Sequence, residues 1–191
     1  GATFRGIQTG TFGKYNAISF NGNKIITTSG GGVLLTNEEE AAEKVRFWST
    51  QAREKAPWYQ HEEIGYNYRL SNVLAGIGRG QMLHLEEHKI LKRDIYFRYK
   101  EGLKDLPLQM NPYLSYSEPN FWLSCILIDP GCPVTPEIIR EKLAEYNVES
   151  RPIWKPMHLQ PVYQDHAFVA SKEGADVGAD IFTRGLCLPS D

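Results

Sequence analysis

Residues 19–32 read SFNGNKIITTSGGG and place one lysine, Lys24, between a short apolar stretch and three consecutive glycines. A second apolar run, VLLT at residues 33–36, follows directly. This order of strand, polar turn, glycines and strand predicts a segment that holds the lysine at a sheet edge with backbone close on both sides. An amine that attacks a carbonyl is favoured by such a partly desolvated place.

The same string resembles the lysine segment of the sugar-nucleotide aminotransferases, the DegT-type branch of the pyridoxal-phosphate-dependent enzymes. That segment reads S-F-x-x-x-K-x-x-T-T-x-x-G-G, and the matching positions here are Ser19, Phe20, Lys24, Thr27, Thr28, Gly31 and Gly32. The resemblance covers the whole chain and is strongest to the members of the UDP-N-acetylbacillosamine 4-aminotransferase type.

The resemblance implies a cofactor, pyridoxal 5'-phosphate, held covalently by Lys24, with Ser19 binding its phosphate. It also implies a reaction, the transfer of an amino group from glutamate to C4 of a nucleotide-linked 4-keto-6-deoxy sugar. Lys24 would carry the proton that this transfer moves.

Residues 65–71, GYNYRLS, resemble the family segment G-x-N-x-R-x-[ST]. In the family this loop crosses a dimer interface, and its asparagine touches the cofactor phosphate of the partner subunit. That role passes to Asn67, and Arg69 is expected to line the same entrance. The implied assembly is a homodimer with a shared active site.

Residues 151–161, RPIWKPMHLQP, resemble a segment that borders the sugar-nucleotide site in the bacillosamine-type enzymes. The resemblance places His158, Trp154 and Lys155 at the substrate. Pro152, Pro156 and Pro161 exclude a helix and predict an extended path over residues 152–163.

The fold class implied is α/β, the pyridoxal-phosphate-dependent transferase fold type I. Residues 1–70 are expected to end the large cofactor-binding domain, residues 71–102 to form a linking helix, and residues 103–191 to form a small α+β domain. Chains of the resembled family are about twice as long, so we expect this chain to be the middle and C-terminal part of a longer polypeptide.

Local signals predict the elements within these parts. Strands are expected at residues 16–20, 32–36, 121–128 and 186–189, and residues 1–15 read as loop. Asn37, Ser71 and Thr135 are expected to cap helices that run to about Ala52, Gly102 and Asn147, and a last helix is expected at residues 174–184.

Composition excludes several classes of protein. With 21 basic and 23 acidic residues the net charge is -2, which gives no electrostatic signature for nucleic acid or an anionic membrane. No apolar run approaches the roughly 20 residues of a membrane helix. Three cysteines without C-x-x-C spacing indicate reduced core thiols and a cytoplasmic protein.

Residues 84–88 match a zinc-binding pattern, but a purely structural role on a helix explains them better. Residues 84–88, HLEEH, match the zinc-peptidase pattern H-x-x-E-H, with His84 and His88 on one helix face. Zinc needs a third protein ligand, and no acid further along the chain is marked out for it. A mixed polar helix face is favoured, and no metal is predicted.

Three alternatives stay open. A GDP-perosamine-synthase-like aminotransferase shares much of the lysine segment. Related dehydratases share the fold but carry histidine where Lys24 stands. A truncated domain with only an assembly or regulatory role is the alternative outside catalysis.

Overall fold

The computed structural model describes residues 1–190, which form two compact units. Unit 1 comprises residues 1–90 and 114–120, and unit 2 comprises residues 91–113 and the chain from Phe121 onward. The boundary lies inside helix α3 (Leu85–Gly102). The expected division at residues 70 and 102 stays a prediction.

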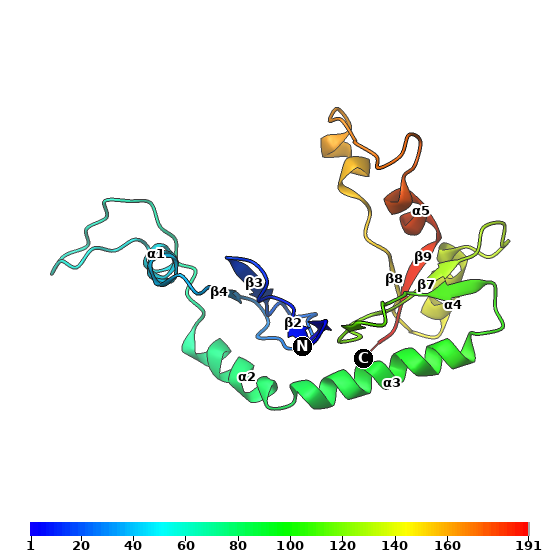
Figure 1. Cartoon of the computed structure of the whole chain (residues 1–191), viewed down its shortest axis with the longest axis horizontal. Helices are drawn as coiled ribbons and strands as arrows, with labels where there is room; N and C mark the ends of the chain where they lie inside the picture. The colour runs from blue at the N-terminus through cyan, green and yellow to red at the C-terminus, as the bar shows by residue number, and fades with distance from the viewer. Residues whose placement is uncertain (191) are drawn as a thin grey trace. The chain divides into compact units, whose positions relative to one another are not determined.

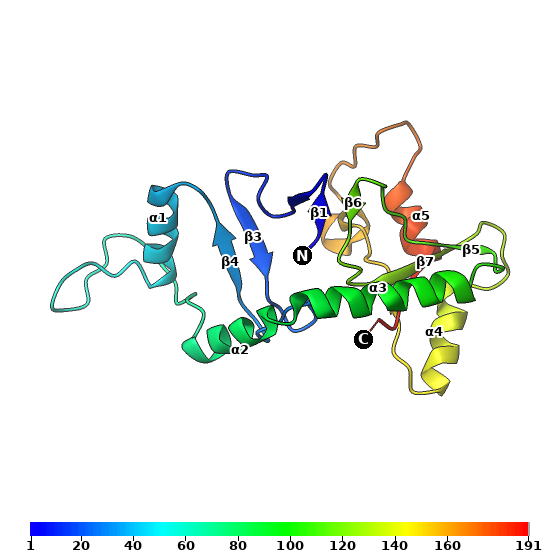
Figure 2. The same ribbon diagram turned by 60° about the horizontal axis from the view of Figure 1, so that its bottom comes forward.

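Two small sheets organise unit 1. Strands β3 (Asn16–Ser19) and β4 (Gly32–Leu35) pair antiparallel, with Ser19 opposite Gly32, as Figure 2 shows. Both strands were predicted to within one residue. The second sheet has the order β2-β1-β6 and consists of β1 (Thr3–Phe4), β2 (Ile7–Gln8) and β6 (Ser117–Glu118).

The prediction of loop for residues 1–15 was wrong at β1 and β2. Arg5 and Gly6, which join these strands, have φ values of 50° and 78°. Two positive φ values in a two-residue connection let the flanking strands pair as a tight hairpin.

Helix α1 (Glu39–Ser49) begins later than predicted, with Glu38 at the N-cap in place of Asn37. The Thr36 hydroxyl accepts a hydrogen bond from the Glu38 N–H at 3.1 Å, which keeps residues 36–38 in a turn. The helix also ends before Ala52, because Gln51 and Ala52 adopt φ values of 69° and 49°. Left-handed residues cannot continue an α-helix.

The linking helix is two helices, α2 (Asn72–Met82) and α3, and Figure 1 shows the break between them. The Ser71 cap is confirmed, since its hydroxyl accepts from the Leu74 N–H at 3.3 Å. At the break, the N–H groups of Leu83 and His84 bond three residues back, to Gly80 and Gln81. Such bonds tighten the last turn of a helix, and the glycines before it weaken helix preference.

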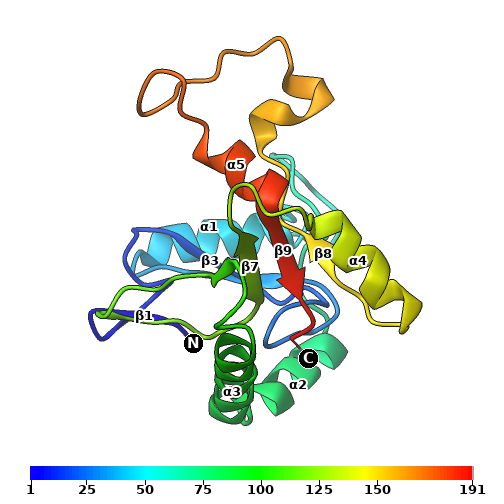
Figure 3. The ribbon, with the colours of Figure 1, turned by 90° about the vertical axis from the view of Figure 1, so that its right-hand side faces the viewer.

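Unit 2 is built on a four-stranded antiparallel sheet of order β5-β7-β9-β8. Its strands are β5 (Leu108–Met110), β7 (Ser124–Ile128), β8 (Arg151–Pro152) and β9 (Gly185–Leu188). Ile126, Leu186 and Leu188 form the buried core on the central strands. Strand β7 begins after Phe121 because that residue has a φ of 51°. Figure 3 shows α5 leading directly into β9.

The helices of unit 2 begin at capping side chains. Thr135 caps α4 (Pro136–Glu145), accepting from the Ile138 N–H at 3.3 Å, and Asn147 adopts a φ of 58°, as predicted. Helix α5 (Val177–Arg184) starts three residues after Gly174, because Asp176 is its N-cap.

The extended path predicted for residues 152–163 was wrong in its second half. Two 3-10 turns, η1 (Met157–Leu159) and η2 (Pro161–Tyr163), occupy it. Pro156 and Pro161 lie at the starts of these turns. The backbone N–H at the start of a helical turn has no acceptor within the turn, so its absence in proline costs no hydrogen bond. Proline therefore excludes an α-helix interior here but permits a single tight turn.

Two cysteines of unit 2 face each other across the sheet. Cys125 on β7 pairs with Cys187 on β9, and their sulfur atoms lie 3.5 Å apart. The hydrogen bond between the thiols raises the pKa of Cys125. Both are free cysteines, as is Cys132, in agreement with the prediction of reduced thiols.

Candidate active site

Lys24 lies in the connection between β3 and β4, here called the lysine loop (residues 20–31). The Lys24 N–H donates to the Asn21 carbonyl at 3.0 Å and closes a tight turn. The ends of the loop are held by the Phe20 N–H on Gly31 O at 3.0 Å and by the Thr28 N–H on Phe20 O at 2.9 Å. Lys24 as a residue is half-buried.

The lysine loop packs against α2 and the first turn of α3. Ile26 and Thr28 are 5% and 1% exposed, so the residues after Lys24 lie in the interior of unit 1. A Cβ added at Gly78 of α2 would lie 2.9 Å from Thr28 Cγ2. This glycine therefore allows a close approach of helix and loop, whereas Gly76 and Gly80 have open space beside them.

Two side chains from these helices reach the backbone of the loop. Gln81 Oε1 accepts a hydrogen bond from the Thr27 N–H at 2.7 Å. His88 Nδ1 lies 3.2 Å from the Ile25 carbonyl oxygen, which can only accept, so Nδ1 carries the hydrogen. The sequence did not single out Gln81, and it presented His88 only as part of a metal pattern.

Ser19 ends β3, five residues before Lys24, and its side chain is exposed. Its hydroxyl oxygen accepts from the Asn21 N–H at 3.3 Å. A serine that accepts through oxygen can still donate its hydrogen to an anion. Ser19 thus lies at the end of the strand that leads into the lysine loop.

Asn67 and Arg69 lie at the end of a long irregular connection, here called the aromatic segment (residues 53–69). Its C-terminal part is joined to the end of α1 by main-chain bonds, including the Tyr66 N–H on Trp48 O at 2.8 Å. The rings of Tyr66 and Tyr68 stack with centroids 5.1 Å apart. Asn67 and Arg69 are exposed. Leu70, directly after Arg69, touches the lysine loop, since a Cβ on Gly31 would lie 2.5 Å from Leu70 Cδ1.

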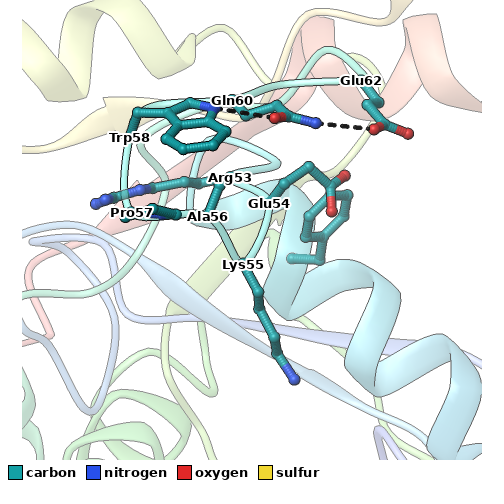
Figure 4. Close-up of a pocket in the computed structure, with 9 residues that line it drawn as sticks. Arg53, Glu54, Lys55, Ala56, Pro57, Trp58, Gln60 and Glu62 are labelled. Carbon is teal, nitrogen blue, oxygen red and sulfur yellow. Dashed lines mark hydrogen bonds between the residues drawn. The ribbon is translucent and has the colours of Figure 1, made fainter.

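The N-terminal part of the aromatic segment surrounds an open hollow of about 550 Å³. Figure 4 shows Trp58, Gln60 and Glu62 joined by hydrogen bonds along one side. Arg53 stacks over the Tyr59 ring at 4.2 Å. No residue singled out for catalysis or binding lines this hollow.

The other predicted binding residues belong to unit 2. His158 Nε2 lies 2.6 Å from Asp176 Oδ2, and the Phe168 ring stacks on the imidazole at 3.8 Å. Asp176 also accepts a hydrogen bond from the Ala179 N–H at 2.9 Å. This bond lowers the pKa of the Asp176 carboxyl most, and the contact with His158 lowers it further. Trp154 and Lys155 are exposed, and Trp154 lies 6.2 Å from Trp122 between ring centroids. Asp176 and Phe168 carried no signal in the sequence.

The histidines of the HLEEH string have partners other than a metal. The expectation that His84 and His88 share one helix face was wrong, because His84 lies in the break between α2 and α3. His84 Nδ1 lies 3.0 Å from Glu87 Oε2, and the His88 ring bonds the backbone of the lysine loop. Across residues 1–190, no three His, Cys, Asp or Glu side chains are arranged to hold a metal ion. Over the same residues, no helix has both the length and the apolar character needed to cross a bilayer.

Comparison with known proteins gives a consistent result. The family profile described as DegT/DnrJ/EryC1/StrS aminotransferase family matches residues 1–191. EpsN of Bacillus subtilis (strain 168), which carries a provisional name as a pyridoxal phosphate-dependent aminotransferase, is 48% identical over 191 residues. That match covers 100% of this chain and 49% of EpsN.

Two further proteins extend the comparison. The GDP-perosamine synthase of Caulobacter vibrioides is 32% identical, with 100% of this chain and 51% of the synthase covered. The solved structure of Helicobacter pylori PseC, an aminotransferase involved in the biosynthesis of pseudoaminic acid, has a TM-score of 0.86 at 22% identity. It covers 98% of this chain and 51% of PseC. The expected fold class is confirmed, and the chain spans about half the length of the curated relatives it matches.

Proposed function

The chain belongs to the DegT/DnrJ/EryC1/StrS aminotransferase family, and on this basis we propose that it is part of a sugar-nucleotide aminotransferase that uses pyridoxal phosphate. The reaction moves an amino group from glutamate to C4 of a nucleotide-linked 4-keto-6-deoxy sugar. This activity is proposed for the whole protein, of which these 191 residues are a part.

The observation that carries the proposal is the setting of Lys24. Lys24 is a half-buried residue on a loop whose backbone is bonded at both ends, and α2 and α3 support the residues that follow it. Most lysines extend into solvent on a flexible stem. A lysine held in this way suits covalent attachment to a carbonyl, because the loop limits the volume that its Nζ explores.

The residues present fit pyridoxal phosphate. Lys24 Nζ would hold its carbonyl carbon, and the exposed Ser19 hydroxyl, five residues earlier, would donate to its phosphate. When bound, the cofactor supplies an electron sink for the carbon from which a proton leaves. The protein supplies orientation and a group that moves the proton.

Lys24 is the proposed proton carrier. In each half-reaction its Nζ, once free of the cofactor, would move one proton between the cofactor's C4′ carbon and the substrate carbon: from the α-carbon of glutamate first, and later to C4 of the sugar. Both transfers need the amine within hydrogen-bond reach of the reacting carbon.

Trp154, Lys155 and His158 are the proposed contacts of the nucleotide sugar. An exposed indole offers a face for a planar base, and Lys155 offers charge for a diphosphate. We propose UDP as the nucleotide, because the 151–161 string resembles the bacillosamine-type enzymes. A GDP-linked sugar is the second candidate, since the chain is 32% identical to a GDP-perosamine synthase.

Asn67 is proposed to act in the site of a second copy. It is exposed on a segment anchored at its base and flanked by stacked tyrosines, which suits contact with another molecule. The proposed assembly is a homodimer in the cytoplasm, where reduced cysteines are the rule.

The test uses the whole protein, incubated with glutamate and with UDP- or GDP-linked 4-keto-6-deoxy sugar in separate reactions. Mass spectrometry should find the 4-amino sugar with the UDP substrate. Product from GDP alone would replace the proposed nucleotide, and no product from either would contradict the function. Lys24→Ala, which lacks the proposed attachment point, is the control for background chemistry.

A further inference from the structure

Within residues 1–190, the backbone directly after Lys24 forms no hydrogen bonds with a neighbouring strand. Residues 25–27 lie outside β3 and β4, so the carbonyl of Ile25 and the N–H of Thr27 have no place in the ladder. These are the two groups that His88 and Gln81 bond. A buried main-chain group left without a partner is unfavourable, so the bonds hold the loop in this one path.

The two bonds bracket a buried residue. Ile26, between the bonded groups, is 5% exposed, and the next residue but one, Thr28, is 1% exposed. Each bond joins residues far apart in sequence, by 54 positions for Gln81 and 63 for His88. Their effect is therefore to fix the loop against the helices, which the turn at Asn21–Lys24 cannot do.

The two side chains reach the loop because of how the helices meet. Gln81 is in the last turn of α2 and His88 in the first turn of α3, seven residues apart. Gly78, one turn before Gln81, permits the approach of α2 to Thr28. His84, between them, points to Glu87 instead and takes no part.

We propose that Gln81 and His88 are positioning residues for Lys24. By holding the backbone one and three residues after it, they fix the origin of the lysine side chain and keep its amine half-buried. The inference rests on the proposed function for its effect on rate. The two hydrogen bonds would supply the positional precision of Lys24 that the reaction needs.

The test compares paired substitutions in the whole protein. In His88→Asn the amide nitrogen stands one bond from Cγ, as Nδ1 does, and can still donate to Ile25. In His88→Gln the nitrogen stands where Nε2 would, so the bond is lost. Gln81→Glu keeps an acceptor for the Thr27 N–H, and Gln81→Leu removes it. His84→Asn is the control, because His84 lies in the turn between the two helices and bonds Glu87 instead of the loop.

With His88→Gln or Gln81→Leu we expect kcat to fall about tenfold, and with both together on the order of 100-fold. The KM for the sugar should change little, because neither residue is placed at the substrate. His88→Asn, Gln81→Glu and His84→Asn should stay within about twofold of the parent. Loss in His88→Asn as large as in His88→Gln would overturn the proposal.

A second readout does not depend on activity. With the cofactor removed, brief acetic anhydride labelling followed by peptide mass analysis measures the reactivity of the Lys24 amine. In the parent it should label more slowly than Lys142, whose side chain is 65% exposed. In the Gln81→Leu/His88→Gln double variant its rate should approach that of Lys142.

The two readouts separate the possible failures. A changed Lys24 labelling rate in a protein that makes no 4-amino sugar keeps the positioning role and rejects the function. Normal transfer and unchanged labelling in the double variant, with the thermal unfolding midpoint retained, keep the function and reject the positioning role.

Discussion

The lysine loop and the aromatic segment are both long connections in unit 1, but they are stabilised differently. The lysine loop buries Ile26 and Thr28 and is held by side chains from α2 and α3. The aromatic segment is bonded to α1 at its base, while Tyr59, Ile64 and Tyr68 are each at least 74% exposed. One connection is packed against helices of this chain, and the other leaves large apolar side chains exposed, as its proposed contact with a second copy requires.

The largest effect should come from the lysine loop. Lys24→Ala removes the proposed attachment point and proton carrier, and we expect kcat to fall about 10²- to 10⁴-fold or more. The unfolding free energy should change by less than about 0.5 kcal/mol, since a half-buried lysine contributes little packing. Activity within tenfold of the parent in steady-state assays would remove Lys24 from the mechanism.

The aromatic segment should act between subunits. Loss of a hydrogen bond to a charged group is worth about 1.5–3 kcal/mol, so Asn67→Ala should weaken cofactor retention on the order of 10- to 100-fold. Because Lys24 and Asn67 would come from different subunits, a mixed dimer of Lys24→Ala and Asn67→Ala chains has one intact site. At a cofactor concentration too low to load Asn67→Ala, co-refolding the two variants at equal amounts should restore about a quarter of parent activity. A mixture that stays inactive although mass spectrometry detects mixed dimers would place both residues in one subunit.

Glycine substitutions test how each connection is held. A Cβ at Gly65 would overlap the backbone nitrogen of Ala52, at the base of the aromatic segment, so Gly65→Ala should cost about 2–3 kcal/mol. Gly31, with a φ of 90°, meets only the end of the Leu70 side chain, and Gly31→Ala should cost about 1–2 kcal/mol. Gly30 has open space and is the matched control, expected within about 0.5 kcal/mol. Urea unfolding measures all three, and equal values for Gly30→Ala and Gly31→Ala would refute the loop geometry.

The smallest effect concerns the His158 cluster of unit 2, which provides a third case. Bonds from the Ala179 N–H and His158 lower the pKa of Asp176 below its ordinary value of 3.8. A carboxyl with a lowered folded pKa contributes stability above the unfolded pKa and loses it as pH falls through the folded pKa. Between about pH 6 and about pH 3, Asp176→Asn should therefore lose less stability than the parent. Identical pH profiles of the unfolding midpoint would show that these contacts do not form in solution.

The fold features that the sequence predicted are local ones. Ser71 and Thr135 were predicted as caps because a cap bonds a backbone group only three residues away. The prediction of Asn37 as a cap was wrong, because the Thr36 hydroxyl bonds the Glu38 N–H and the helix begins one residue later, with Glu38 as its N-cap. The hairpin of β1 and β2 was missed because it depends on a positive φ at Arg5, a residue with no special preference for that conformation.

The site divides in the same way. Lys24 and Ser19 could be proposed from the sequence because they share one continuous string with the glycines that shape the loop. Gln81, His88 and Asp176 could not, since each acts through a contact formed only on folding and is an ordinary polar residue in its own segment. The aromatic segment gave Asn67 by its motif, but no pattern stated that its tyrosines would stack.

The central claim, that Lys24 is the amine which holds pyridoxal phosphate, has one direct test. The whole protein is loaded with the cofactor, reduced with borohydride, digested and mapped by mass spectrometry. The account predicts the reduced cofactor on the peptide that contains Lys24 and its absence from the protein treated with glutamate beforehand. A stable adduct on any other lysine, with Lys24 unmodified, would contradict it.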